Sequence, residues 1–182
     1  TVKSLFYGEG SMTSRVKLRD YPKASVVVCS YNGAKTLDRC LTSLKEINYP
    51  SYEVILVDDG STDNTHEIAA RHPWVKNIRQ ENKGLSFARN VGAHASCGDV
   101  IVYTDSDCMA DPDWLYYLMG TLLSGDYAGV GGPNISPPAE NWVQACVSAA
   151  PGGPNHVLLT DVVAEHIPGC NMAFHRWAFA QV

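Results

Sequence analysis

The sequence predicts an α/β domain with a mostly parallel central sheet flanked by helices. Short apolar runs rich in β-branched residues recur at positions 25–30, 54–57 and 100–103, and a further short strand is expected over 75–79. A segment with helical periodicity or helix-capping residues follows each run. Alternation of this kind is typical of a parallel sheet. It is lost after Gly125, so we expect a mixed or antiparallel portion at the end of the sheet.

Each predicted helix has its own signal. Leucines at spacing i, i+4 and i+7 give the first helix a buried stripe. Thr62 or Asp63 is predicted to cap the second helix, and Ser86 the third. Asp111 and Pro112 mark the start of the fourth helix, because Pro is favoured in the first turn. The predicted spans are about 35–46, 63–72, 86–96 and 112–124.

The two ends of the chain carry weaker signals. Residues 1–22 lack periodicity and are treated as a leader of uncertain structure, so the domain is predicted to span 23–182. Residues 142–149 predict a short helix. A strand is expected over 171–174, and 175–177 begin another helix.

Composition narrows the classes of function. A net charge of −5 over 182 residues gives no general attraction to nucleic acid, and membrane contact is not indicated. The six cysteines form no C-x-x-C pair, so a zinc site or disulfide framework is not expected. No stretch is apolar enough to span a membrane, and no signal peptide opens the chain. We therefore expect a cytoplasmic protein, including the cytoplasmic face of a membrane in a parent protein.

Acidic residues follow the strand at 100–103 directly. Asp105 and Asp107 stand two residues apart at its predicted carboxyl end. Ligands of open α/β sheets bind at the carboxyl ends of strands. A pair of carboxylates there can share a hard cation, or divide between a cation and a sugar hydroxyl. Because Asp111 already serves the next helix, a purely structural role for both acids is disfavoured.

Three strand ends together offer the groups that a nucleoside diphosphate needs. The first strand ends in Ser30 and Tyr31, whose ring can stack on a base, and the second ends in the carboxylate of Asp59. Asp59 can accept a pyrimidine N–H. A cation at Asp107 would neutralise the diphosphate, with Arg89 and Lys83 assisting from the adjacent helix and turn.

Four segments resemble the successive motifs of family 2 glycosyltransferases of the Rossmann-like GT-A fold. They are SVVVCSYN at 25–32, VDDGSTD at 57–63, NKGLSFARNVG at 82–92 and TDSD at 104–107. The resemblance covers roughly residues 23–180 and keeps the family order. It implies a nucleotide-sugar-binding domain that is apparently truncated at its C-terminus.

The resemblance also implies roles for individual residues. Asp59 would recognise uracil, Asp105 the ribose and Asp107 the metal, with Ser30 and Tyr31 along the nucleoside. Gly84 and Arg89 would face the diphosphate, and residues 169–174 would line the sugar and acceptor pocket. The predicted metal ligands are thus Asp107 and Asp105, and the predicted nucleotide-binding residues are Ser30, Tyr31, Asp59, Lys83, Gly84, Arg89, Asp105 and Ser106.

The activity that the resemblance implies is transfer of a sugar, with inversion, from a nucleotide-diphosphate sugar to an acceptor hydroxyl. A UDP-sugar is favoured as donor, Mg²⁺ or Mn²⁺ as cofactor, and the acceptor (glycan, lipid or protein) is unknown. The family's general base belongs to an acidic motif that would lie beyond Val182, so no catalytic residue is assigned. The alternative is a truncated or degenerate module that binds a nucleotide sugar without turnover.

A second alternative is a phosphohydrolase of the haloacid dehalogenase type. The strand followed by Asp105 and Asp107 resembles its nucleophile motif. That family requires Thr or Val where Met109 stands, and a later Lys, whereas no Lys follows Lys83. We therefore rank it below the glycosyltransferase.

Overall fold

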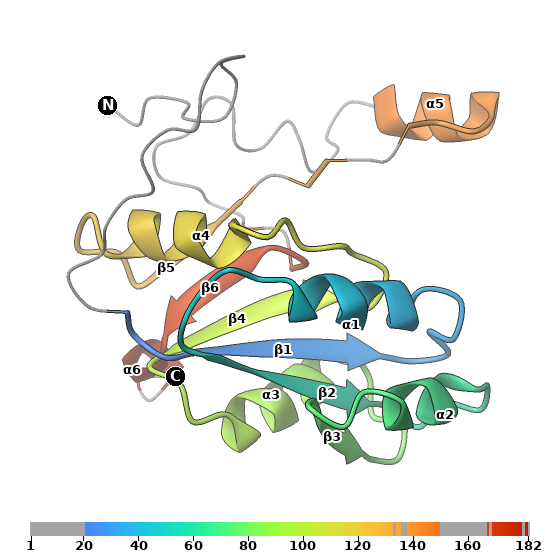
Figure 1. Ribbon diagram of the computed structural model, residues 1–182, viewed down its shortest axis with the longest axis horizontal. Coiled ribbons are helices and arrows are strands. Elements are labelled where there is room, and N and C mark those ends of the chain that lie inside the picture. Colours follow the sequence, from blue (N-terminus) through green and yellow to red (C-terminus); the bar gives the residue numbers. More distant parts are fainter. Residues whose placement is uncertain are drawn as a thin grey trace.

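The computed structural model describes residues 21–132, 134–135, 138–149, 167, 169–179 and 181. Its core is one six-stranded sheet in the order β3-β2-β1-β4-β6-β5 (Figure 1). The four strands β1 (Ala24–Ser30), β2 (Tyr52–Asp58), β3 (Lys76–Arg79) and β4 (Val100–Asp105) are parallel. This confirms the α/β prediction.

The far side of the sheet is mixed, also as predicted. Strand β6 (Met172–His175) pairs antiparallel with β4 and with β5 (Gly129–Gly131). The sequence did not predict β5, because its three residues include two glycines and form no apolar run. Strand β5 forms the edge of the sheet, with β6 as its strand partner.

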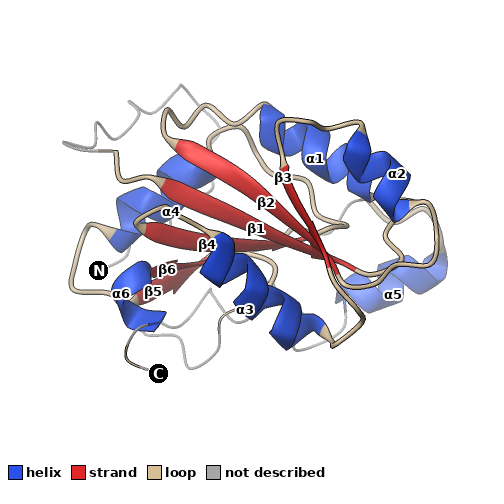
Figure 2. Ribbon diagram, turned by 90° about the horizontal axis from the view of Figure 1, so that it is seen from below, coloured by secondary structure: helices blue, strands red, loops and turns tan. Residues whose placement is uncertain are grey.

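Helices cover both faces of the sheet, with α1 and α4 on one side and α3 on the other (Figures 1 and 2). Strand residues alternate between the two faces: Val26 and Val28 pack toward α1 and α4, and Val27 and Cys29 toward α3. The helices are α1 (Leu37–Lys45), α2 (Thr65–Ala70), α3 (Leu85–Ala95), α4 (Trp114–Leu122), α5 (Trp142–Ala149) and α6 (Arg176–Phe179).

The helix-capping residues in the structure differ from those that the sequence predicted. Ser86 is not the cap of α3, because the helix begins one residue earlier, after Gly84. The N–H groups of Lys83 and Gly84, just before this helix, donate hydrogen bonds to the carboxylate of Asp59, which is distant in sequence. Neither Thr62 nor Asp63 is the N-cap of α2, because that residue is Asn64. Asp63 lies one residue before the cap and accepts the N–H of Thr65.

Most of the predicted leader lies outside the described residues, which begin at Tyr21. Tyr21 makes edge-to-face contacts with Tyr49 and Tyr116, so this end of the leader packs on the domain. The structure has all six cysteines as free thiols. Among the described helices, none combines the length and the apolar character that crossing a bilayer demands.

Candidate functional site

The polar strand ends meet at one edge of the sheet. Register places Ser30 of β1 beside Asp58 of β2, and Cys29 of β1 beside Asp105 of β4. The segments that follow β1, β2 and β4 therefore begin side by side at the carboxyl ends of these three neighbouring strands. The predicted convergence of the Ser30, Asp59 and Asp105 segments is confirmed as geometry.

Asp59 is buried at this edge, with 4% of its surface exposed. Its Oδ1 accepts hydrogen bonds from Gln80 Nε2 at 2.6 Å and from the Lys83 N–H at 2.9 Å. Its Oδ2 accepts the Gly84 N–H at 2.8 Å. Burial alone would raise the pKa of Asp59, but these three donors outweigh it, so the pKa is lowered. Asp59 is thus held as a carboxylate.

Two glycines create the turn geometry that brings these donors to Asp59. Gly60 has φ of 76° and Gly84 has φ of 90°, a region in which glycine is favoured. A Cβ on Gly60 would lie 2.7 Å from the Asn82 nitrogen. The Asp59–Gly60 turn can therefore pack against residues 80–84 only because position 60 has no side chain.

Asn32 fixes the segment after β1 to the segment after β2. It is the non-glycine residue with positive φ (54°) in the described part of the chain. Its side-chain oxygen accepts the Thr62 N–H at 2.8 Å, and its own N–H donates to Ser61 Oγ at 2.9 Å. Asn tolerates this left-handed conformation better than most residues, which explains its place here.

A small cavity of about 70 Å³ lies between these segments and α3. Tyr31 is 54% exposed at its mouth, whereas Ser30 is 3% exposed and its hydroxyl has no hydrogen-bond partner in the described part of the structure. An aromatic face, an unpaired hydroxyl and a fixed carboxylate thus share one cavity. Its lining is Cys29, Ser30, Tyr31, Asp59, Leu85 and Ala88.

Asp105 ends β4 beside Cys29, which lines this cavity, and Asp107 follows two residues later. Asp105 Oδ1 lies 3.4 Å from the Arg89 guanidinium, which also donates to the Gly169 carbonyl at 3.1 Å. Burial raises the pKa of Asp105, and the charge of Asp107 adds to this while Arg89 opposes it. Arg89 therefore links α3, the end of β4 and the turn before β6.

The other predicted residues take distinct places. Gly84 and Lys83 each donate a backbone N–H to Asp59. The ammonium group of Lys83 lies 5.0 Å from the ring centroid of Phe87. Ser106 lies near the start of α1, since a Cβ on Gly33 would come within 3.1 Å of Ser106 Oγ. The same Cβ would lie 2.3 Å from Ser30 Oγ. Gly33 therefore leaves room for both serine hydroxyls.

Comparison with known proteins identifies the family of this chain. Residues 25–182 match the family model described as glycosyl transferase family 2. The chain belongs to this family. The glycosyltransferase AglE of Haloferax volcanii is 33% identical over 134 residues, which are 66% of this chain and 44% of that protein. The glucosyl-dolichyl phosphate glucuronosyltransferase of the same organism is 27% identical over 177 residues, 88% of this chain and 55% of that protein.

Solved structures share the fold. The mannosyltransferase PcManGT of Pyrobaculum calidifontis, in complex with GDP-Man and Mn²⁺, aligns with a TM-score of 0.69 at 23% identity. The alignment covers 90% of this chain and 47% of that one. TarS of S. aureus in complex with UDP-GlcNAc has a TM-score of 0.53 at 25% identity, covering 63% and 37%. The chain thus spans about half the length of the relatives it matches.

The acidic residues of this family 2 domain suit a metal ion whose coordination shell includes oxygen atoms of a substrate. No group of three or more His, Cys, Asp or Glu side chains gathers in the part of the chain that the structure describes. Asp105 and Asp107 stand as a pair of oxygen donors at the strand end. Mg²⁺ is commonly bound by one or two carboxylates together with substrate phosphates. The residues present therefore fit a divalent cation that arrives with a diphosphate.

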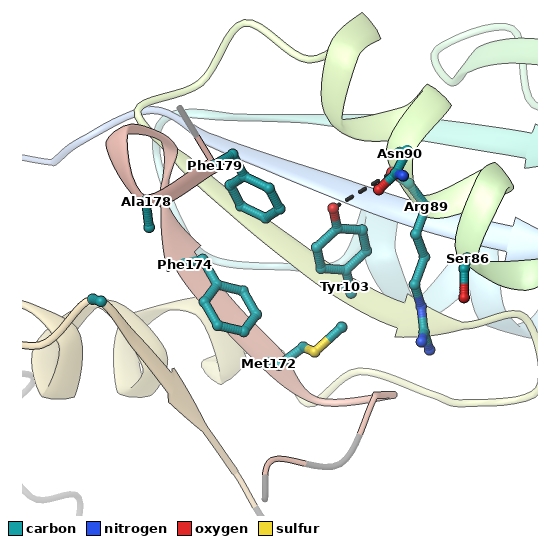
Figure 3. Close-up of a pocket in the computed structure, with 9 residues that line it drawn as sticks. Ser86, Arg89, Asn90, Tyr103, Met172, Phe174, Ala178 and Phe179 are labelled. Atoms are coloured by element: carbon teal, nitrogen blue, oxygen red, sulfur yellow. Dashed lines mark hydrogen bonds between the residues drawn. The ribbon is translucent and has the colours of Figure 1, made fainter. Parts of the chain in front are cut away.

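An apolar pocket of about 460 Å³ lies on the α3 side of the sheet, over β4 and β6 (Figure 3). Tyr103, Met172 and Phe174 form its wall, and Arg89 stands beside them. Met172 and Phe174 belong to the segment that was predicted to line a sugar and acceptor pocket. The full lining is Ser86, Arg89, Asn90, Tyr103, Ala128, Met172, Phe174, Ala178 and Phe179.

Sequence reasoning missed Gln80, Asn32 and Gly33. Gln80 directly follows β3, whose carboxyl end lies at the same sheet edge as those of β1 and β2. The strand-end rule that selected Asp59 would also have selected Gln80. Gly33 had no such signal, because its role depends on how closely Ser30 and Ser106 approach it.

Proposed function

We propose that this domain is the donor-binding part of a glycosyltransferase that moves a sugar from a nucleotide-diphosphate sugar to an acceptor hydroxyl. The observation that carries the proposal is the shared cavity of Tyr31, Ser30 and Asp59 beside Asp105. The Tyr31 ring provides a stacking face, and Asp59 an acceptor for a base N–H. Family membership supports the same reading.

A UDP-sugar is the favoured donor. Structural neighbours have been solved with GDP-Man and with UDP-GlcNAc, so the shared fold does not by itself fix the base. The choice must come from this chain's own side chains. A small cavity with one fixed carboxylate favours the smaller ring of a pyrimidine.

Asp105 and Asp107 would hold the cation together with the diphosphate of the donor. A bound Mg²⁺ or Mn²⁺ supplies charge neutralisation for the departing nucleoside diphosphate. Arg89 would add a second positive charge from α3, and its contact with the Gly169 carbonyl would keep the turn before β6 close to the donor. Asp105 would also accept a ribose hydroxyl, because it pairs in register with Cys29, which lines the cavity proposed for the base.

For the transfer itself we propose direct displacement with inversion by an acceptor hydroxyl. Within the described residues we assign no general base. The acceptors named for relatives include lipids, as in the cholesterol galactosyltransferase of Borreliella burgdorferi, so the acceptor class is left open between glycan, lipid and protein. The free state of all six cysteines supports a reducing, cytoplasmic setting as part of the proposal.

The test is a calorimetric titration of UDP, with and without Mn²⁺, on the wild-type chain and on Asp107→Asn. We expect Mn²⁺ to strengthen UDP binding and the substitution to abolish this Mn²⁺-dependent gain, because it removes a carboxylate ligand. Asp126→Asn is the matched control, because it removes an exposed carboxylate between α4 and β5. UDP binding that ignores both Mn²⁺ and Asp107 would contradict the metal-assisted donor site.

Donor binding and transfer are then separated by a turnover assay. Release of UDP from a UDP-sugar in the presence of candidate acceptors would support transfer. Tight UDP binding without release under any acceptor would favour the alternative, a module that binds a nucleotide sugar without turnover.

A further inference from the structure

The side chain of Gln80 donates a hydrogen bond to the carboxylate of Asp59, which is proposed to recognise the base of the donor. Gln80 Nε2 donates to Asp59 Oδ1 at 2.6 Å, and the Lys83 N–H donates to the same oxygen. We propose that Gln80 is a specificity-determining residue that restricts Asp59 to a base with one N–H donor, uracil or thymine, and excludes guanine. This inference rests on the proposed donor site.

The acceptor positions of Asp59 support this. An ionised carboxylate has about four acceptor positions, two on each oxygen. The bonds from Gln80 and Lys83 fill both positions of Oδ1, and the bond from Gly84 fills one of Oδ2. A single position remains on Oδ2 for a ligand.

The bases differ in what they require of a carboxylate. Uracil and thymine present one ring N–H between two carbonyl groups, so one acceptor position satisfies them. Guanine presents a ring N–H and an adjacent exocyclic amino group, which together suit both oxygens of a carboxylate. With Oδ1 filled, guanine would lose one of its two bonds and bury an unpaired donor.

Gln80 is held where it can keep this position filled. Its N–H donates to the Asp58 carbonyl at 3.0 Å, which anchors the backbone directly after β3. Its Oε1 is buried and has no hydrogen-bond partner among the described residues. The contact with Asp59 is therefore the hydrogen bond that orients the amide, and it also helps to keep the carboxylate ionised.

The experiment compares Kd values of UDP, dTDP and GDP, each with Mn²⁺, for the wild-type chain, Gln80→Met and Gln80→Ala. Met keeps the length of the side chain but removes its donor, and Ala opens the position entirely. We expect the wild type to prefer UDP and dTDP over GDP. In both variants we expect the GDP-to-UDP Kd ratio to fall at least tenfold.

Gln144→Met is the matched control, because Gln144 is an exposed glutamine on α5 and its loss should leave the ratio unchanged. A ratio that stays constant in both Gln80 variants, or equal loss of UDP and GDP, would show a merely structural role and overturn the inference. A wild-type preference for GDP would overturn it as well. A wild-type chain that binds none of the three nucleotides would instead reject the proposed donor site, and this inference with it.

Discussion

The two ends of the parallel sheet differ in how completely their polar groups are hydrogen-bonded. At the amino ends of β1, β2 and β4, Glu53 Oε1 accepts Ser25 Oγ at 2.6 Å and the Cys97 N–H at 2.8 Å. Arg176 closes the same end by donating to the Gly98 carbonyl at 2.6 Å and to Ser96 Oγ at 2.9 Å. These polar groups are paired within the chain.

At the carboxyl ends the pairing is incomplete. Ser30 Oγ has no partner among the described residues, Asp59 keeps one acceptor position, and Tyr31 is exposed. Buried polar groups in folded proteins are usually satisfied, so an unsatisfied cluster requires an explanation. A ligand that completes the bonds is that explanation here. The comparison predicts that substitutions at the amino end change stability, and that those at the carboxyl end change donor affinity.

The largest expected effect is at the amino end, for Gly98→Ala. The added Cβ would lie 2.5 Å from the Lys23 carbonyl oxygen and 2.8 Å from the Ser25 nitrogen. Because these are backbone atoms, the strand ends must shift, and we expect a loss of about 3 kcal/mol in the free energy of unfolding. Urea denaturation measures the loss. UDP affinity should stay within about twofold where the variant is folded.

Gly120→Ala provides the control for this substitution. Gly120 lies inside α4, and a Cβ there meets nothing within 4 Å. Alanine is favoured over glycine in a helix, so we expect about 0.5 to 1 kcal/mol of added stability. Equal destabilisation by both substitutions would show that the close packing at Gly98 is not what matters.

At the carboxyl end the informative change is Tyr31→Ala. If the ring stacks on the base, its removal should weaken UDP binding by about 1 to 2 kcal/mol, roughly five- to thirtyfold. Unfolding should change by no more than about 0.5 kcal/mol, because the side chain is exposed. Calorimetry and urea denaturation on one preparation measure both quantities. Tyr31→Phe should retain UDP binding, and equal losses in Phe and Ala would assign the effect to the hydroxyl instead.

The sequence predicted the functional end better than the structural end. Continuous apolar runs and the polar residues after them located Ser30, Asp59 and Asp105 at one sheet edge, since the rule for parallel strands depends only on strand order. It placed the late strand at 171–174, and β6 covers Met172–His175.

What the sequence did not predict depends on contacts between distant segments. The donors to Glu53 come from Ser25 and Cys97. The backbone donors to Asp59 come from Lys83 and Gly84, just before α3. None of these pairs has a characteristic spacing. Strand β5 likewise exists through its pairing with β6 and has no apolar run of its own.

The last prediction concerns a pH dependence at the amino end. Burial would raise the pKa of Glu53, but hydrogen bonds from Cys97 and Ser25, and the charge of Lys23, lower it to about 2. Since the pKa is lower in the folded chain, Glu53 stabilises the fold above the unfolded value of about 4.5, and this contribution is lost as the pH falls toward 2. Glu53→Gln should therefore lose about 1 to 2 kcal/mol at pH 7, given the partial exposure of the carboxylate.

Urea denaturation of wild type and Glu53→Gln between pH 7 and pH 3.5 measures this difference. It should be largest at pH 7 and shrink below pH 4.5, because the wild type loses its advantage as Glu53 is protonated. Glu46→Gln, at the exposed C-terminal end of α1, should show no such trend. UDP affinity at pH 7 should be the same in all three proteins. If the Glu53 variant is fully folded but binds UDP more weakly than the wild type, the two ends of the sheet are coupled. That outcome would contradict the division into a structural end and a donor-binding end.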